Sequence, residues 1–223
     1  MKKIRVIVAC EESQAVCKAF RERGFEAFSC DIEPCSGGHP EWHFQEDIFT
    51  VLRREPTFDL MIAHPPCTFL SNAGACRLYP QAGKLDPVRY KKGLDAKRFF
   101  MQLLEWPIKH VAVENPVSSR VFEMPEYDQE IQPYQFGHPY TKKTRSGAEL
   151  CPGAKRYQED TQMKKLFALM LAVLLLASVL TGCVQKKYGA AERGNDAKNR
   201  SKTFEGIAQA MAEQWGNFLK GKI

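Results

Sequence analysis

Paired cysteines are missing from this sequence, although it contains eight cysteine residues. None of the eight stands in a CxxC pair, and their spacing forms no regular framework. A structural zinc site is usually built from such pairs, and a disulfide-stapled secreted domain shows a regular framework. We therefore expect a reduced, cytoplasmic protein that holds no metal.

We also expect neither a secretory leader nor a full-length membrane span. The first three residues run directly into the strand-like stretch 4–9, which is followed by charged residues. The longest apolar run, residues 166–180, is shorter than the roughly 20 residues that a membrane-spanning helix needs. We expect a soluble fold, and association with a membrane through 166–180 is the alternative.

Acidic residues are scarce in the last part of the chain. Residues 1–139 hold 17 Lys and Arg against 19 Asp and Glu, a net charge of −2, whereas residues 140–223 hold 15 against 7, a net charge of +8. Because Lys and Arg neutralise phosphates, DNA would be gripped from this C-terminal part. A solvated or membrane-proximal basic tail explains the charge equally well.

Apolar runs typical of buried strands alternate with helix-like stretches. Strands are expected at 4–9, 26–30, 58–63 and 110–113, and helices at 13–23 and around 96–104. This alternation predicts a mostly parallel, doubly wound α/β sheet. At 223 residues the chain suffices for one such domain with an appendage.

A cysteine directly follows one of these predicted strands, in the stretch 58–74, FDLMIAHPPCTFLSNAG. Pro65 and Pro66 cannot continue a ladder, so the chain leaves the sheet there. Ligands of open α/β sheets bind at the carboxyl edge, so Cys67 is well placed for chemistry. A small buried hydrophobe is the alternative role of such a cysteine.

Polar residues follow several other predicted strands: Glu11, Asp31, Glu114 and Asn115. An acid after the second strand is the usual acceptor for the ribose hydroxyls of a nucleoside cofactor. Asp31 is equally well explained as a helix cap or turn residue.

Four motifs in order resemble the DNA cytosine-5 methyltransferases, particularly the short phage-type members. They are PPCTFLSNAG around Cys67, VEN at 113–115, GHPYTKK at 137–143 and SKTFEGIAQAMAEQWG at 201–216. The resemblance implies a Rossmann-like S-adenosylmethionine-dependent methyltransferase fold. It also implies transfer of a methyl group from S-adenosylmethionine to cytosine in DNA.

The resemblance further implies roles for individual residues. Cys67 would add to carbon 6 of cytosine, Glu114 would hydrogen-bond or protonate ring nitrogen 3, and Asn115 belongs to the same base-gripping motif. The residues expected to bind the cofactor are Cys10, Glu11, Ser13, Asp31, Asp47 and Pro65. Those expected to bind DNA are Ser71, Lys142 and Lys143, and a solvated basic turn explains the two lysines equally well. The family's first motif is a glycine-rich turn, whereas residues 9–14 contain no glycine.

The segment 163–183 reads like a bacterial lipoprotein signal placed inside the chain, with a Met-Lys-Lys start and LTGC at its end. A packed hydrophobic helix, a membrane-contacting segment and a foreign insertion each explain it. We expect a catalytic domain at 1–144, an atypical insertion with an apolar helix (166–180) at 145–199, and a returning helix at 200–223. The alternative function is a degenerate or chimeric protein without activity, which binds membrane or nucleic acid through its basic, apolar C-terminal part.

Overall fold

The computed structural model describes four stretches of the chain: residues 3–75, 77–131, 144–150 and 205–221. All four stretches belong to one compact unit. The predicted apolar helix at 166–180 and the predicted DNA ligands Lys142 and Lys143 lie outside the described residues, so these predictions stay predictions.

Seven strands of the described chain form one sheet, in the order β3-β2-β1-β4-β5-β7-β6. They are β1 Arg5–Ala9, β2 Glu26–Asp31, β3 His43–Gln45, β4 Leu60–Ala63, β5 His110–Pro116, β6 Gln129–Ile131 and β7 Thr144–Leu150. Strands β1 to β5 pair in parallel, whereas β7 is antiparallel to both β5 and β6. The predicted mostly parallel α/β sheet is confirmed.

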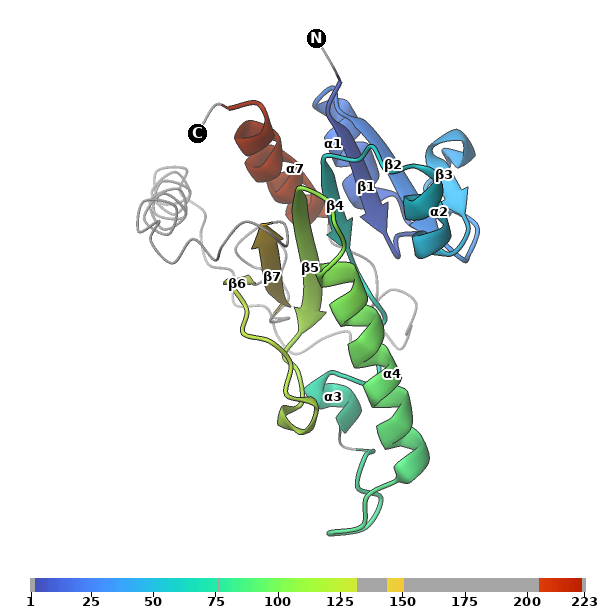
Figure 1. Ribbon diagram of the computed structural model, residues 1–223, viewed down its shortest axis with the longest axis vertical. Helices are drawn as coiled ribbons and strands as arrows, with labels where there is room; N and C mark the ends of the chain where they lie inside the picture. Colours follow the sequence, from blue (N-terminus) through green and yellow to red (C-terminus); the bar gives the residue numbers. More distant parts are fainter. Residues whose placement is uncertain (1–2, 76, 132–143, 151–204, 222–223) are drawn as a thin grey trace, which may run out of the picture. The chain divides into compact units, whose positions relative to one another are not determined.

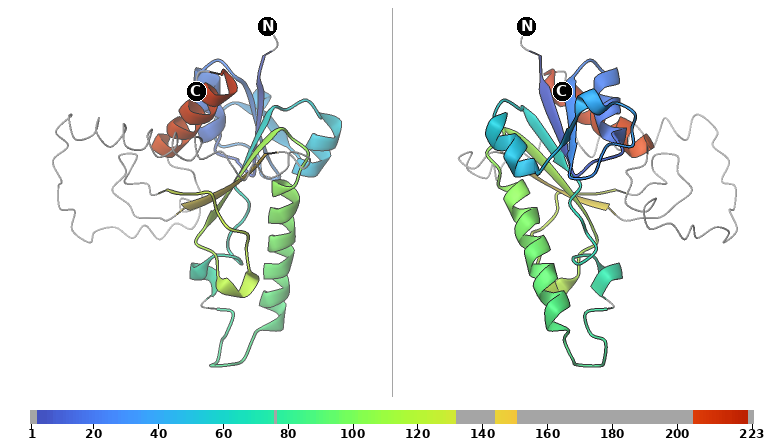
Figure 2. Two further views of the ribbon diagram at one scale, coloured as in Figure 1. Left: turned by 60° about the vertical axis from the view of Figure 1, so that its left-hand side comes forward. Right: turned by 90° about the vertical axis from the view of Figure 1, so that its right-hand side faces the viewer.

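Helices cover both faces of this sheet (Figures 1 and 2). The covering helices are α1 Ala15–Glu22, α2 Ile48–Arg54, α4 Pro87–Leu104 and α7 Glu205–Leu219. The described chain also has the short helix α3 Asn72–Ala75 and the 3-10 turns η1 Pro40–Trp42 and η2 Arg120–Phe122. Because strand side chains alternate, Ile7 and Ala9 of β1 pack with α2 and α4, whereas Val6 and Val8 pack with α1 and α7. The sheet is therefore doubly wound.

The strand order changes direction at β1: β2 and β3 lie on one side of it, and β4 and β5 lie on the other. β1 lies between β2 and β4, and Ala9 pairs with Ala63 at the last register position. This is the switch point of a Rossmann-like sheet, where ligands bind outside the carboxyl ends of the strands. Residues that follow β1 and β4 therefore occupy the most favourable place for a ligand.

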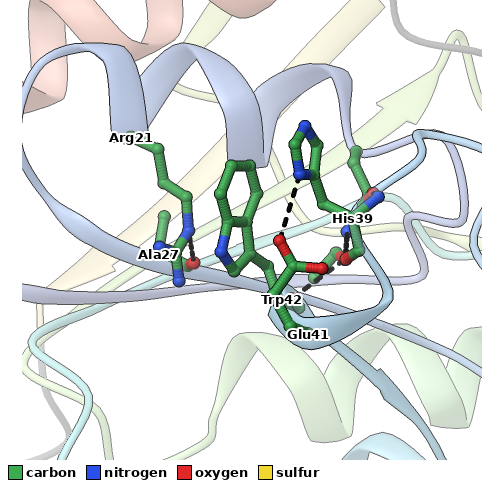
Figure 3. Close-up of polar contacts among 7 residues, drawn as sticks. Arg21, Ala27, His39, Glu41 and Trp42 are labelled. Carbon is green, nitrogen blue, oxygen red and sulfur yellow. Dashed lines mark hydrogen bonds and ion pairs between the residues drawn. The ribbon is translucent and has the colours of Figure 1, made fainter.

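The sequence analysis assigns no element to residues 43–45, where the structure has the edge strand β3. An aromatic stack precedes this strand (Figure 3): the Trp42 ring lies between the Arg21 guanidinium, 4.2 Å from its centroid, and the His39 ring, 3.7 Å away. The buried Gln14 side chain also accepts from the His39 N–H (3.0 Å) and donates to the His39 carbonyl (2.8 Å). These tertiary contacts hold a strand that is too short to be recognised from its pattern.

Helix α7 lies against α1 through small residues. Its buried positions are Ile207, Ala208, Ala212 and Gly216. A Cβ on Gly216 would lie 2.9 Å from the Phe25 ring, so this position requires glycine for the close approach. The C-terminal helix therefore completes the core on the α1 face of the sheet.

Candidate active site

The HPPC stretch leaves the sheet directly after β4. The His64 N–H donates to the Ala9 carbonyl (3.0 Å), which extends the ladder between β1 and β4 by one residue. Pro65 and Pro66 then carry the chain away from the sheet. The Leu70 and Ser71 N–H groups donate to the Cys67 carbonyl (3.1 and 2.9 Å), so Cys67 starts a tight turn beyond the carboxyl edge. Its side chain is partly exposed.

Backbone hydrogen bonds join the loop after Cys67 to the segment after β5. Ser71 and Ser118 form an antiparallel bridge. The Asn72 N–H donates to the Val117 carbonyl (2.9 Å), and the Ser119 N–H donates to the Leu70 carbonyl (2.8 Å). The Pro-Pro-Cys and Glu-Asn motifs, which are separated by about fifty residues, are thereby brought together at one edge of the sheet.

Close packing fixes the loop itself. A Cβ on Gly74 would lie 2.0 Å from the Thr68 carbonyl oxygen, so no other residue fits there without displacing the backbone. The Ser71 hydroxyl, a predicted DNA contact, is buried and accepts from the Gly74 N–H (3.3 Å). Ser71 therefore shapes the loop in this conformation, and its contact with DNA stays a prediction.

The Glu114 side chain contacts His64, a residue to which the sequence analysis assigns no role. His64 Nδ1 lies 2.6 Å from Glu114 Oε2, and the exposed fractions of the two side chains are 8% and 16%. Their positions could have suggested the pair, because each follows one of two strand residues that stand in register, Ala63 and Val113. Residues at matching positions on neighbouring strands point to the same face.

Glu11 also lies near His64, but its carboxylate accepts hydrogen bonds from backbone N–H groups. Its carboxylate is buried and accepts from the Val16 N–H (2.6 Å) and the Cys17 N–H (3.1 Å), two donors in the first turn of α1. Burial raises the pKa of Glu11, and the charge of His64 and the two hydrogen bonds oppose this rise. Glu11 thus fastens α1 to the turn after β1 and places negative charge near His64.

Asn115 faces the opposite side of the sheet from Glu114, because consecutive strand residues alternate. Its Nδ2 donates to Ser118 Oγ (2.6 Å), whereas its buried Oδ1 has no hydrogen-bond partner within the described part of the chain. Asn115 lines a cavity of about 310 Å³ together with Phe100 of α4 and Tyr127. Its direct structural effect is to hold the turn that joins β5 to the Cys67 loop.

The turn after β1 adopts left-handed backbone conformations without glycine. Cys10 and Gln14 both have φ of 58°. Burial raises the pKa of the Cys10 thiol to about 12, and the nearby charges of Asp31, Cys30 and Asp47 act in the same direction. Asp31 and Asp47, two further predicted cofactor ligands, therefore lie close enough to Cys10 to act on its thiol.

The remaining predicted cofactor residues lie at the same edge. Asp31 Oδ1 accepts from the Glu33 N–H (3.0 Å), and Asp47 Oδ1 caps α2 by accepting from the Thr50 N–H (3.0 Å). The Ser13 carbonyl lies against Gly37, where a Cβ would be only 2.6 Å away. Pro65 is buried.

Among the described residues, no group of three or more His, Cys, Asp or Glu is arranged to hold a metal ion. No helix in that part of the protein is long and apolar enough to cross a membrane.

Comparison with solved structures finds similarity to the crystal structure of the S. pombe Dnmt2 methyltransferase. The identity is 15%, the TM-score is 0.42, and the match covers 67% of this chain and 50% of that chain. This chain thus spans about half the length of that protein. No family model matches the sequence, and no curated protein matches it.

Proposed function

We propose that this protein transfers a methyl group from S-adenosylmethionine to carbon 5 of cytosine in DNA, with Cys67 as the nucleophile. The observation that carries this proposal is the pairing of the Cys67 loop with the segment after Glu114, through the Ser71–Ser118 bridge. A nucleophile and a carboxyl group that act on one base must belong to one site, and this pairing supports that requirement.

Cytosine reacts at carbon 5 only after a nucleophile has added to carbon 6. The Cys67 thiolate forms the bond to carbon 6, while Glu114 supports ring nitrogen 3 with a hydrogen bond or a proton as electron density moves onto the ring. Carbon 5 would then bond to the methyl group, whose bond to the donor's sulfur breaks and leaves a neutral thioether. A base or water would take the carbon 5 proton, and the electron pair of that C–H bond would reform the 5,6 double bond as the C–S bond breaks to release the Cys67 thiolate. Ring nitrogen 3 would return any proton that it received to Glu114. A base in a duplex must first leave the stack to reach such a site.

The residues at the switch point fit the cofactor. Asp31 ends β2 next to β1, as a ribose-binding acid does in Rossmann-like sheets, and its side chain is partly exposed. Asp31 and Asp47 add negative charge beside Cys10, which suits a cationic sulfonium compound. Cys10, Ser13 and Pro65 would line the same place, and Glu11 would act there by fixing the start of α1. When bound, the cofactor supplies the methyl group.

A surface for DNA lies in residues 77–98, which we name the basic lobe. This segment contains seven basic residues, Arg77, Lys84, Arg89, Lys91, Lys92, Lys97 and Arg98, against two acidic ones, Asp86 and Asp95. The loop before α4 and the first turns of α4 extend past the carboxyl end of β5 (Figure 1). Lysines at that edge would neutralise phosphates next to the Cys67 loop.

Apolar side chains are interleaved with these charges. Tyr79, Leu85, Val88 and Leu94 are exposed large hydrophobic residues of the basic lobe. The Arg89 guanidinium is held in place by the Gly74 carbonyl (3.0 Å) and lies 5.0 Å from the Phe69 ring centroid, which ties α4 to the loop after Cys67. Phosphates bound by the lobe would therefore be positioned relative to the nucleophile.

Transfer of labelled methyl groups to unmethylated plasmid DNA tests this function. The wild-type protein should incorporate label, Cys67→Ala should lose incorporation by a factor on the order of 10³ or more, and Cys35→Ala should behave as the wild type. Cys35 is the matched control because it is another partly exposed free cysteine. Equal incorporation by wild type and Cys67→Ala would reject the mechanism.

A further inference from the structure

We propose that His64 is a positioning residue for Glu114: its imidazole fixes the carboxyl group in the orientation that ring nitrogen 3 of the target base requires. This inference rests on the proposed function and adds a residue to its site. The observation that carries it is the 2.6 Å separation between His64 Nδ1 and Glu114 Oε2. With Nδ1–H as the donor and Oε2 as the acceptor, the proton that ring nitrogen 3 needs is carried by Oε1.

A glutamate needs such an anchor because its side chain has several rotatable bonds. Ordering a Glu side chain that has no partner costs it rotamer freedom. The carboxyl group is planar, so a bond from His64 to Oε2 also restricts where Oε1 points. A charge-assisted N–H···O contact of this length is among the stronger hydrogen bonds in proteins.

His64 can serve as an anchor because its own position is fixed from several sides. Its N–H is bonded to the Ala9 carbonyl (3.0 Å) in the sheet ladder, and Pro65 and Pro66 restrict the chain that follows. The side chain is only 8% exposed. The imidazole is thus held on a rigid strand end, whereas Glu114 has three side-chain torsions to fix.

Glu11 supplies the electrostatic support for this arrangement. Its carboxylate is held by the N–H groups of Val16 and Cys17, and its charge interacts with His64. His64 therefore lies in the field of two carboxylates that belong to different elements, the turn after β1 and the end of β5. This field favours an imidazole that donates toward carboxylate oxygen over one that turns away.

Three substitutions of His64 test the positioning role with labelled S-adenosylmethionine and unmethylated plasmid DNA. His64→Ala should lower kcat by a factor on the order of 10 to 100, while KM for DNA stays within about twofold. His64→Asn should restore most of kcat, because its Nδ2 takes the place of Nδ1. His64→Gln places its amide one bond further out and should not restore it. Equal kcat for His64→Ala and wild type, or equal rescue by Asn and Gln, would overturn the proposal.

An NMR readout separates this proposal from the proposed function. With 15N-labelled histidine, the strongly bonded Nδ1–H should give a far-downfield proton resonance that is present in wild type and Cys67→Ala and absent from His64→Ala. Glu114→Gln should shift or remove this resonance. A wild-type protein that shows the resonance but transfers no methyl group would reject the function alone. Absence of the resonance from the folded wild-type protein would reject the positioning role. Thermal melting of each variant shows whether it folds.

Discussion

Two carboxylates, Glu11 at the turn after β1 and Glu114 at the end of β5, share a neighbour in His64 but differ in their use. Glu11 is 4% exposed, and each of its two carboxylate oxygens accepts a hydrogen bond from an N–H group of α1. The Glu114 side chain is 16% exposed and meets His64 through Oε2. The two carboxylates thus differ in their hydrogen-bond partners and in the exposed fractions of their side chains.

This difference separates a structural acid from one that is available for chemistry. A carboxylate consumed by backbone donors at the start of a helix stabilises the fold, as a cap does. A carboxylate oriented by a side chain at the carboxyl edge of a sheet can act on a ligand. Sequence position alone does not distinguish them, because both follow a buried strand and both lie at the same edge.

Of the two acids, Glu114 should give the larger effect on turnover when it is changed to Gln. The amide keeps the size of the side chain but cannot deliver a proton to ring nitrogen 3, so kcat should fall by a factor on the order of 10² to 10³. Thermal melting should stay close to that of the wild type, because the amide oxygen of Gln can still accept from His64 Nδ1. Methyl transfer assayed beside a melting curve measures both. A variant that melts much earlier would assign Glu114 the same structural role as Glu11.

Substitution of Glu11 should act on stability instead. Glu11→Ala removes the acceptor of two N–H groups in the first turn of α1, so the free energy of unfolding should fall by about 1 to 3 kcal/mol. Glu11→Gln keeps one acceptor oxygen and should lose less. Urea unfolding of the three proteins checks the order. Unchanged stability in Glu11→Ala would contradict the capping role.

Much of the frame around these acids could be predicted from the sequence. The apolar run before HPPC and the two prolines indicate a strand end at Ala63, and Val113 to Asn115 indicate another. The hydrogen bonds of Glu11 could not be predicted, because they depend on where α1 begins in three dimensions. The same holds for the Ser71–Ser118 bridge, which joins loops that no periodic pattern connects.

The sequence motif also did not predict the directions in which its two polar side chains point. Glu114 and Asn115 are neighbours in sequence and are predicted to act together, yet they face opposite sides of β5. Asn115 reaches Ser118 and the cavity beside α4, whereas Glu114 reaches His64. A sequence motif shows only that the two residues are neighbours in the chain. Because consecutive residues of a strand point to opposite faces of the sheet, their side chains are separated in the structure.

A double-mutant cycle measures how strongly His64 is coupled to each of the two acids. In urea unfolding, Glu11→Gln and His64→Ala should show a coupling energy of about 0.5 to 3 kcal/mol, since the two side chains interact through a buried field. In kcat, His64→Ala should add little to the loss already caused by Glu114→Gln, because both changes disable one pair. Additive losses in kcat would show that His64 acts independently of Glu114.

The smallest expected effect is a pH dependence from His110, which lies on the same face of β5 as Glu114. His110 packs against Phe218 with a centroid distance of 5.0 Å, and burial lowers its pKa, with Lys109 acting in the same direction. The unfolded chain therefore binds the proton more readily than the folded one, so stability should fall as pH drops below about 6.5. His110→Phe should flatten this part of the stability curve between about pH 7 and pH 5. An unchanged slope would show that other groups cause it.

The most direct test of the central claim is to capture the bond between Cys67 and a cytosine ring. DNA that carries 5-fluorocytosine should trap the adduct once the methyl group has been transferred, because fluorine cannot leave carbon 5 as the proton does. Mass spectrometry of the digested complex should then find the modified base on Cys67, and Cys67→Ala should form no complex. An adduct on Cys10 or Cys35, or a complex that survives in Cys67→Ala, would contradict the account.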